Sequence, residues 1–200
     1  TRPDDPMVST AWLAAHLDAP DVRVVDASWH LPGAERDARA EYMAGHIPGA
    51  VFFDIDEISD TSSPQPHMAP PPEKFASRVK RLGLGDGARI VIYDSTGIFS
   101  APRVWWLFRL MGHEDVRVLD GGLPKWTAEG RPLEDMPPMA RERHFTVRYH
   151  PGLVRSLAQV EAKLATGDAA VLDARPAGRF EGTAPEPRPG LPLSLIHISQ

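Results

Sequence analysis

The sequence predicts an α/β protein in which helices cover both faces of a parallel sheet, with one complete domain and the start of a second. Two observations support this fold class. From residue 9 to residue 129, short apolar segments alternate with amphipathic helical segments, and this alternation is typical of a parallel sheet. In addition, the stretch STAWLAAHLDAPDVRVVDAS (9–28) returns as SLAQVEAKLATGDAAVLDAR (156–175).

The two similar stretches align without a gap. They begin at residues 9 and 156 and end at 28 and 175, so both ends are offset by 147 positions, and eight of the twenty aligned residues are identical. A self-match at a domain-sized period indicates two related domains in tandem. We therefore expect a complete amino-terminal domain, a linker, the opening of a second domain, and a tail of foreign character. The corresponding ranges are 1–130, 131–154, 155–190 and 191–200.

Each element before residue 73 has a local signal. Ser9 can cap a helix that carries Leu13 and Leu17 on one face. An apolar run after this helix predicts a short buried strand, and a later helical stretch is stopped by the glycines and proline of GHIPGA (45–50). Serines and prolines then predict a long surface loop. The expected elements after the first helix are a strand at 22–26, a helix at 35–45, a strand at 51–54 and a loop at 59–72.

The later elements follow the same logic. RIVIYD (89–94) is the clearest buried strand, and Pro102 stands where a helix prefers to begin. The helix after it is apolar nearly all round, so it should be deeply packed. Prolines and charges make 131–151 a semi-rigid linker, and Ser156 with Gln159 forms a capping-box pattern. The remaining expected elements are helices at 74–82, 103–111, 123–129 and 157–164, and strands at 116–119 and 170–173.

Composition excludes several classes of partner and site. Hydrophobic residues make up 42% and charged residues 24% of the chain, as in ordinary globular proteins. The net charge of −5 provides no basic field for nucleic acid, and no apolar run reaches the ~20 residues of a membrane span. The absence of cysteine excludes disulfides and thiolate ligands in this chain and favours a reducing, cytoplasmic location. The histidines lack metal-ligand spacing, so no metal or other cofactor is expected.

Five stretches resemble the tandem rhodanese-type sulfurtransferases, most closely those that use 3-mercaptopyruvate. They are VVDASWHLP (24–32), GHIPGAVFFDID (45–56), SAPRVWWLFRLMGH (100–113), LDGGLPKW (119–126) and DARPAGRFEGTAPEPRPG (173–190). The resemblance implies a rhodanese-like sheet and the transfer of sulfane sulfur from 3-mercaptopyruvate or thiosulfate. The acceptor it implies is cyanide or a thiol such as thioredoxin, and the sulfur is carried as a persulfide on a cysteine of the second domain.

That cysteine is missing from this chain, which is therefore expected to be inactive by itself. In the first copy the strand before the corresponding loop ends at Asp94, and an offset of 147 places its counterpart near position 241, beyond Gln200. Asp94 stands at or next to the position that a nucleophile would take. A carboxylate there would repel an anionic sulfur donor, so we expect this loop only to shape the domain.

The resemblance assigns the donor carboxylate to Arg179 and Arg188. Two guanidinium groups can hold a carboxylate through paired hydrogen bonds. The alternative is that both arginines are solvated or pair with Glu181 and Glu186.

The resemblance also assigns Asp56 and His67 to a proton relay with a serine of the cysteine loop. An aspartate can orient an imidazole, which then moves protons near neutral pH. The two residues are eleven positions apart and can meet only if the loop between them folds back. The alternative is a surface histidine. His46 is expected to stabilise a turn.

Two other functions remain open besides the enzyme. The chain could be a non-catalytic rhodanese-like binding or regulatory module, or a relative of the cysteine phosphatases, which would also need the missing cysteine. Arg179 and Arg188 favour the enzyme, because a stand-alone module has no need for carboxylate-binding residues in a second domain.

Overall fold

The computed structural model describes residues 5–167 and 169–185. They form two compact units, which we describe separately. The larger unit contains residues 5–30 and 36–151, and the smaller one contains residues 31–35 and 152–185.

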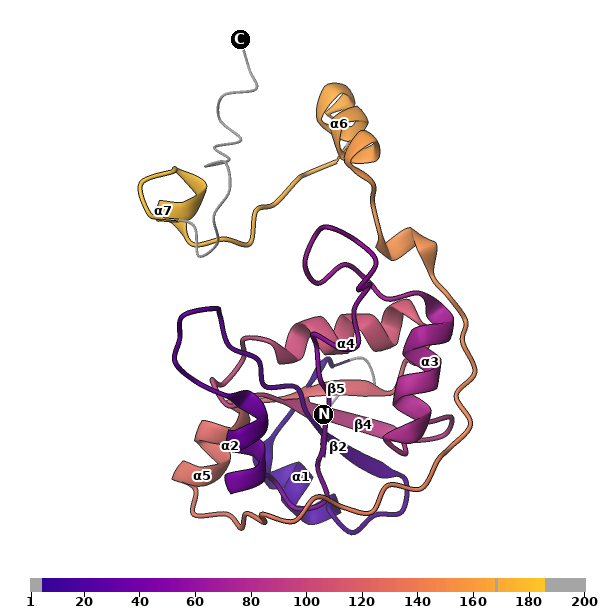
Figure 1. Ribbon diagram of the computed structural model, residues 1–200, viewed down its shortest axis with the longest axis vertical. Coiled ribbons are helices and arrows are strands. Elements are labelled where there is room, and N and C mark those ends of the chain that lie inside the picture. The colour runs from indigo at the N-terminus through magenta and orange to yellow at the C-terminus, as the bar shows by residue number, and fades with distance from the viewer. Residues whose placement is uncertain (1–4, 168, 186–200) are drawn as a thin grey trace. The chain divides into compact units, whose positions relative to one another are not determined.

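The larger unit is built around a five-stranded parallel sheet (Figure 1). The strand order is β1-β5-β4-β2-β3, and every neighbouring pair is parallel. The predicted α/β class and parallel sheet are thus confirmed. β1 was not foreseen, because two residues carry too little pattern. The strands are β1 (Met7–Val8), β2 (Val22–Asp26), β3 (Val51–Phe52), β4 (Arg89–Tyr93) and β5 (Val116–Leu119).

Helices cover both faces of this sheet, as expected. Side chains alternate between the two faces of a strand, and Val91 and Tyr93 of β4 join a cluster with Leu13 and Trp126. This face is covered by α1 (Thr10–His16), α2 (Ala38–Ala44) and α5 (Gly122–Ala128). The other face is covered by α3 (Pro72–Arg81) and α4 (Ala101–Leu110), which meet through the rings of Phe75 and Phe108, 5.1 Å apart.

Two of the helix starts that differ from the expected positions have a clear local reason. α2 begins three residues later than predicted because Asp37 caps it, accepting the backbone N–H groups of Arg39 and Ala40 at 2.9 and 3.0 Å. α3 begins two residues earlier because Pro72 occupies its first turn, where proline is well tolerated.

Residues 131–150, expected to be a linker, run along the larger unit and belong to it. The backbones of His46 and Glu134 exchange two hydrogen bonds of 2.9 Å, and Asp86 donates its N–H to the carbonyl of His144 at 2.8 Å. Phe145 is only 3% exposed. This segment therefore completes the core, and the prolines and charges around Phe145 obscured that role in the sequence.

The smaller unit contains α6 (Leu157–Thr166) and α7 (Ala177–Phe180), and a short 3-10 helix, η1 (Pro151–Leu153), lies at the boundary. The predicted capping box is confirmed. Ser156 Oγ accepts the N–H of Gln159 at 3.3 Å, and Gln159 Oε1 accepts the N–H of Ser156 at 2.8 Å.

The strand predicted at residues 170–173 is wrong. No strand is formed there, and Leu172 is 90% exposed. A parallel strand needs a neighbour to pair its backbone groups, and no described residue pairs with this one. The tail at 191–200 lies outside the described residues.

Candidate functional site

The candidate site lies at the carboxyl edge of the sheet. Trp29 follows β2, Asp56 follows β3, and the loop of residues 94–101 follows β4. Because parallel strands end at one edge, the loops after them gather there, which is where open α/β sheets bind their ligands.

Asp56 and His67 are in direct contact at this edge. His67 Nε2 lies 2.5 Å from Asp56 Oδ1. The loop between them therefore folds back, which is the condition that the proposed pairing required. The His67 side chain is 19% exposed and that of Asp56 is 67% exposed. The imidazole is thus largely enclosed, while the carboxylate in contact with it stays open to solvent.

Trp29 is a third member of this group, and the sequence reasoning missed it. Its indole N–H lies 3.2 and 3.1 Å from the two carboxylate oxygens of Asp56. Its ring meets the imidazole of His67 edge-on, with centroids 4.9 Å apart. Its position just beyond the carboxyl end of the buried strand β2 could have marked it as a candidate site residue.

Arg103 holds the backbone of His67 from α4. Its guanidinium donates a hydrogen bond to the carbonyl oxygen of His67, and burial lowers the pKa of Arg103, although an arginine stays charged in proteins. His67 has φ +56°, a left-handed conformation that is uncommon for residues other than glycine. No local pattern links Arg103 to His67, because 36 positions separate them.

The loop after β4 closes around its own carboxylate. Asp94 Oδ1 accepts the N–H of Thr96 at 2.9 Å, and Oδ2 accepts three more N–H groups, those of Phe99, Ser100 and Ala101, at 2.7 to 3.0 Å. The aspartate is 1% exposed. Backbone N–H groups at such a strand–loop–helix turn form an anion-binding concavity. Here these four donors already have an acceptor, which supports the expectation that the loop shapes the domain.

Gly122, at the start of α5, lets this loop approach closely. Its φ is +54°, and a Cβ there would lie 2.6 Å from the carbonyl oxygen of Asp94. The Gly121-Gly122 pair is therefore needed for the turn from strand to helix.

His46 stabilises a turn, as expected. It is fully buried, its Nδ1 lies 2.7 Å from the carbonyl oxygen of Tyr42, and its ring stacks on the Tyr42 ring at 4.0 Å. Its backbone N–H and C=O form hydrogen bonds with the backbone of Glu134. These contacts indicate a structural role for His46.

The two candidate arginines of the second copy are not brought together in the described part of the chain. Arg179 is partly buried in α7, in the smaller unit. Arg188 lies outside the described residues. Their joint role in holding a carboxylate therefore stays a prediction.

The described residues contain neither a cluster of metal ligands nor a membrane-spanning helix. Over residues 5–167 and 169–185, no three histidine, aspartate or glutamate side chains gather as metal ligands. None of the helices described there has the length and apolar character needed to cross a membrane.

Comparison with known proteins gives a consistent result. The model of the rhodanese-like domain matches residues 9–129. The human 3-mercaptopyruvate sulfurtransferase is 44% identical over 191 residues, covering 92% of this chain and 64% of the relative. The Arabidopsis thaliana mitochondrial thiosulfate/3-mercaptopyruvate sulfurtransferase 1 is 42% identical over 208 residues, covering 94% of this chain and 55% of the relative.

A solved structure agrees with these relatives. The crystal structure of the Escherichia coli 3-mercaptopyruvate sulfurtransferase SseA superposes with a TM-score of 0.84 at 41% identity, covering 88% of this chain and 68% of that one. The chain thus spans 55% and 64% of the length of the two curated relatives above. From the matched domain, the shared fold and this similarity, we conclude that the chain belongs to the rhodanese-like domain family.

Proposed function

We propose that this chain forms part of a sulfurtransferase that moves sulfane sulfur from 3-mercaptopyruvate, or less well from thiosulfate, to a thiol or to cyanide. The observation that carries the proposal is the contact of His67 with Asp56 at the carboxyl edge of the sheet. Similarity to sulfurtransferases over 92% of the chain supports the same reaction class.

In the proposed reaction, a cysteine thiolate outside this sequence attacks the sulfur of 3-mercaptopyruvate. The carbon–sulfur bond breaks, sulfur remains on the cysteine as a persulfide, and the electron pair passes to the carbon as the enolate of pyruvate. A proton then converts the enolate to pyruvate. We assign the delivery of this proton to a relay that includes His67, with Asp56 orienting the imidazole.

Arg179 and Arg188 are proposed to hold the carboxylate of the donor. A guanidinium matches the two oxygens of a carboxylate, and the resemblance of the sequence around these two arginines to the family is the reason to prefer a carboxylate donor over thiosulfate. An acceptor such as thioredoxin and a cytoplasmic location also belong to this proposal. The absence of cysteine, which suits a reducing compartment, supports the location.

The chain by itself is proposed to be inactive. It contains no cysteine, and Asp94 fills the loop of the first copy. Because the backbone N–H groups of this loop already bond to Asp94, a second candidate is also favoured. In this candidate the larger unit acts as a non-catalytic rhodanese-like module.

A chimera tests the enzyme proposal. The part of Escherichia coli SseA beyond its aligned region is joined to this chain, and thiocyanate formation from 3-mercaptopyruvate and cyanide is measured for the chimera and for the chain alone. We expect turnover by the chimera and none by the chain. Turnover by the chain alone, or a folded chimera that is inactive with 3-mercaptopyruvate and also with thiosulfate as the donor, contradicts the proposal.

Variants of the chimera test the relay. His67→Gln and Asp56→Asn should each lower kcat with 3-mercaptopyruvate by about 10²-fold or more, the usual contribution of general acid–base catalysis. His144→Gln is the matched control, because that histidine is exposed and pairs with Asp86 elsewhere on the larger unit. Equal rates for His67→Gln and His144→Gln would remove His67 from the mechanism.

A further inference from the structure

A cavity lies at the opposite edge of the sheet from the Asp56–His67 pair. It has a volume of about 390 Å³ and is bounded by the end of α1, the first residues of β2 and β3, the turn after α3, and residues 138–143. These segments precede the strands, so the cavity is distinct from the site at the carboxyl edge.

Three arginines line this cavity, namely Arg23, Arg141 and Arg143, and Asp18 is the one acidic residue in its lining. Within the described residues, none of the three arginines forms an ion pair with a carboxylate. The chain as a whole carries a net charge of −5, so this cavity is a local exception to its charge. Three arginines that line one cavity favour the binding of an anion there.

Arg23 and Arg143 are close enough for their positive charges to repel each other. Burial, followed by the positive charge of Arg143, lowers the pKa of Arg23, while Asp21 opposes this shift. Two like charges held together are costly without a counter-ion. A bound anion would relieve this repulsion.

The segment that contains Arg141 and Arg143 is positioned by backbone contacts with the end of α3 and the turn after it. Arg143 donates its N–H to the carbonyl of Lys80 at 3.3 Å. At Gly83, with φ +72°, a Cβ would lie 3.0 Å from the carbonyl oxygen of Arg141, and at Gly85 it would lie 2.3 Å from that of His144. These close approaches depend on glycine, so the chain places both arginines at the cavity without a ligand.

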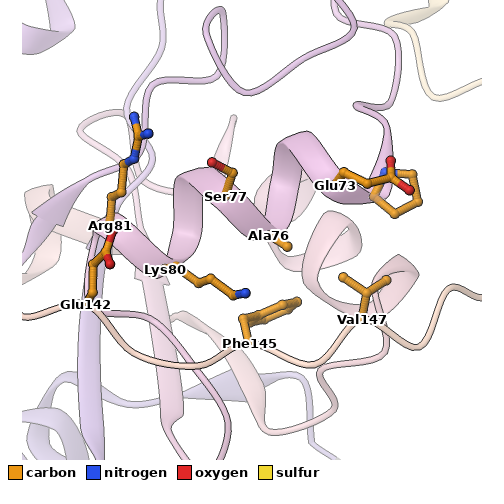
Figure 2. Close-up of a pocket in the computed structure, with 9 residues that line it drawn as sticks. Glu73, Ala76, Ser77, Lys80, Arg81, Glu142, Phe145 and Val147 are labelled. Atoms are coloured by element: carbon orange, nitrogen blue, oxygen red, sulfur yellow. The ribbon is translucent and has the colours of Figure 1, made fainter.

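The neighbouring cavity does not share this charge. It lies between α3 and residues 142–147, has a volume of about 550 Å³, and is lined by charges of both signs: Glu73, Glu142, Lys80 and Arg81 (Figure 2). Because of this alternation, Arg141 and Arg143 line one cavity and the acidic side chain between them, Glu142, lines the other.

We propose that Arg23, Arg141 and Arg143 form a binding site for a small organic phosphate. A phosphoryl group offers three oxygens to guanidinium groups, which bind such groups bidentately. Leu17, Pro20, Pro48 and Met139 supply apolar walls beside the arginines, which suits an ester that carries an apolar body. The cavity volume falls within the usual range for small-molecule sites.

Calorimetric titration of the full chain with phenyl phosphate at low ionic strength tests this site. We expect saturable binding that the double variant Arg141→Gln/Arg143→Gln weakens at least tenfold. Arg148→Gln is the matched control, because Arg148 comes from the same segment but lines a different cavity, and it should stay within twofold of the parent. Both altered side chains of the double variant are exposed, and circular dichroism checks its fold.

Four results would overturn the proposal. The first is no binding of phenyl phosphate to the parent chain, and the second is equal weakening of binding by the double variant and by Arg148→Gln. The third is benzoate binding as tightly as phenyl phosphate, which excludes phosphate recognition. The fourth is inorganic phosphate binding as tightly as phenyl phosphate, which excludes a role for the apolar walls.

Discussion

Asp94 Oδ2 accepts the backbone N–H of Phe99 at 2.7 Å, within the loop that joins β4 to α4. The same carboxylate also binds the N–H groups of Thr96, Ser100 and Ala101. A thiolate is stabilised by similar backbone donors at a helix amino terminus. This copy of the domain therefore uses an anion-binding turn for its own side chain, which fixes the loop and leaves its donors without capacity for a substrate.

Asp94→Ala should destabilise the larger unit by about 3 kcal/mol, because it leaves buried N–H groups without an acceptor. Asp94→Asn should cost less, since its amide oxygen can still accept. Urea unfolding followed by tryptophan fluorescence measures both. Asp115→Asn is the control. Asp115 is exposed and pairs with Arg89 at 3.3 Å, so its loss should cost about 0–1 kcal/mol. Equal stability of Asp94→Ala and Asp115→Asn would contradict the role of the buried carboxylate.

Phe145→Ala should cost about 3–5 kcal/mol, as expected for a large aromatic residue removed from a core. Its ring lies 5.6 Å from that of Phe75 and 6.2 Å from that of Phe108. Tyr149→Ala, at an exposed position in the same segment, should change stability by less than about 0.5 kcal/mol. Equal, small effects of the two variants would mean that residues 131–150 are not part of the cooperative core.

The sequence predicted elements well where the local pattern decides the structure. The bounds of β2 and β5 match the predicted ranges, because apolar runs between turn signals define buried strands. Ser9 caps α1 through the N–H of Trp12 at 3.1 Å, and Ser156 caps α6 in the same way. The two similar stretches of sequence thus begin helices at corresponding positions.

The errors arise where a distant partner decides the structure. The strand expected at 170–173 has the pattern of β2, but β2 forms between β3 and β4, whereas no described strand lies beside 170–173. Trp29 and Arg103 were missed as members of the site because their partners, Asp56 and His67, are 27 and 36 positions away. Asp56 and His67 themselves came from the family resemblance, since nothing in their spacing specifies a contact.

Arg103→Ala should loosen the loop that carries His67. The guanidinium holds the carbonyl of His67, next to Met68, whose carbonyl accepts the N–H of Asp60 at 2.9 Å. Amide exchange of Asp60, followed by NMR, should accelerate by about tenfold or more, as expected for the loss of roughly 1.4 kcal/mol of local stability. The amide of Ile92 in β4 should be unaffected.

Arg109→Ala provides the matched control for Arg103→Ala. Arg109 lies on the same helix, but its guanidinium sits over the ring of Trp105 at 5.3 Å, away from His67. This variant should leave the exchange of Asp60 unchanged. If both variants accelerate it equally, the effect comes from α4 as a whole and not from the contact with His67.

Asp86 should make stability depend on pH in the acid range. Burial would raise the pKa of Asp86, but hydrogen bonds from Thr146 and His144 outweigh it and lower that pKa to about 2. The unfolded value is about 3.9, so this contribution is present above about pH 4 and is lost as the pH falls through about 2. Because the Asp86 side chain is 48% exposed, solvent screening keeps the contribution below about 1 kcal/mol.

Asp86→Asn should therefore flatten the stability profile between pH 4 and pH 2, measured by urea unfolding. Thr146→Val should act in the same direction, because Thr146 Oγ1 donates to Asp86 Oδ2 at 2.6 Å. A profile for Asp86→Asn that matches the parent over this range would show that Asp86 does not contribute.

The amides of α6 should exchange much faster than those of α1, although the repeat aligns the two helices. Both begin with a serine cap, so capping does not distinguish them. Thr10 and Leu13 of α1 are buried, whereas α6 has no buried residue. Helices shorter than about 12–15 residues are marginal in water without tertiary contacts, so α6, with ten residues, should show protection of less than about tenfold. Hydrogen exchange by mass spectrometry measures both helices in one sample. Equally slow exchange in α1 and α6 would mean that α6 is stabilised by packing absent from the described contacts, and the view that the second copy lacks a core of its own would then fail.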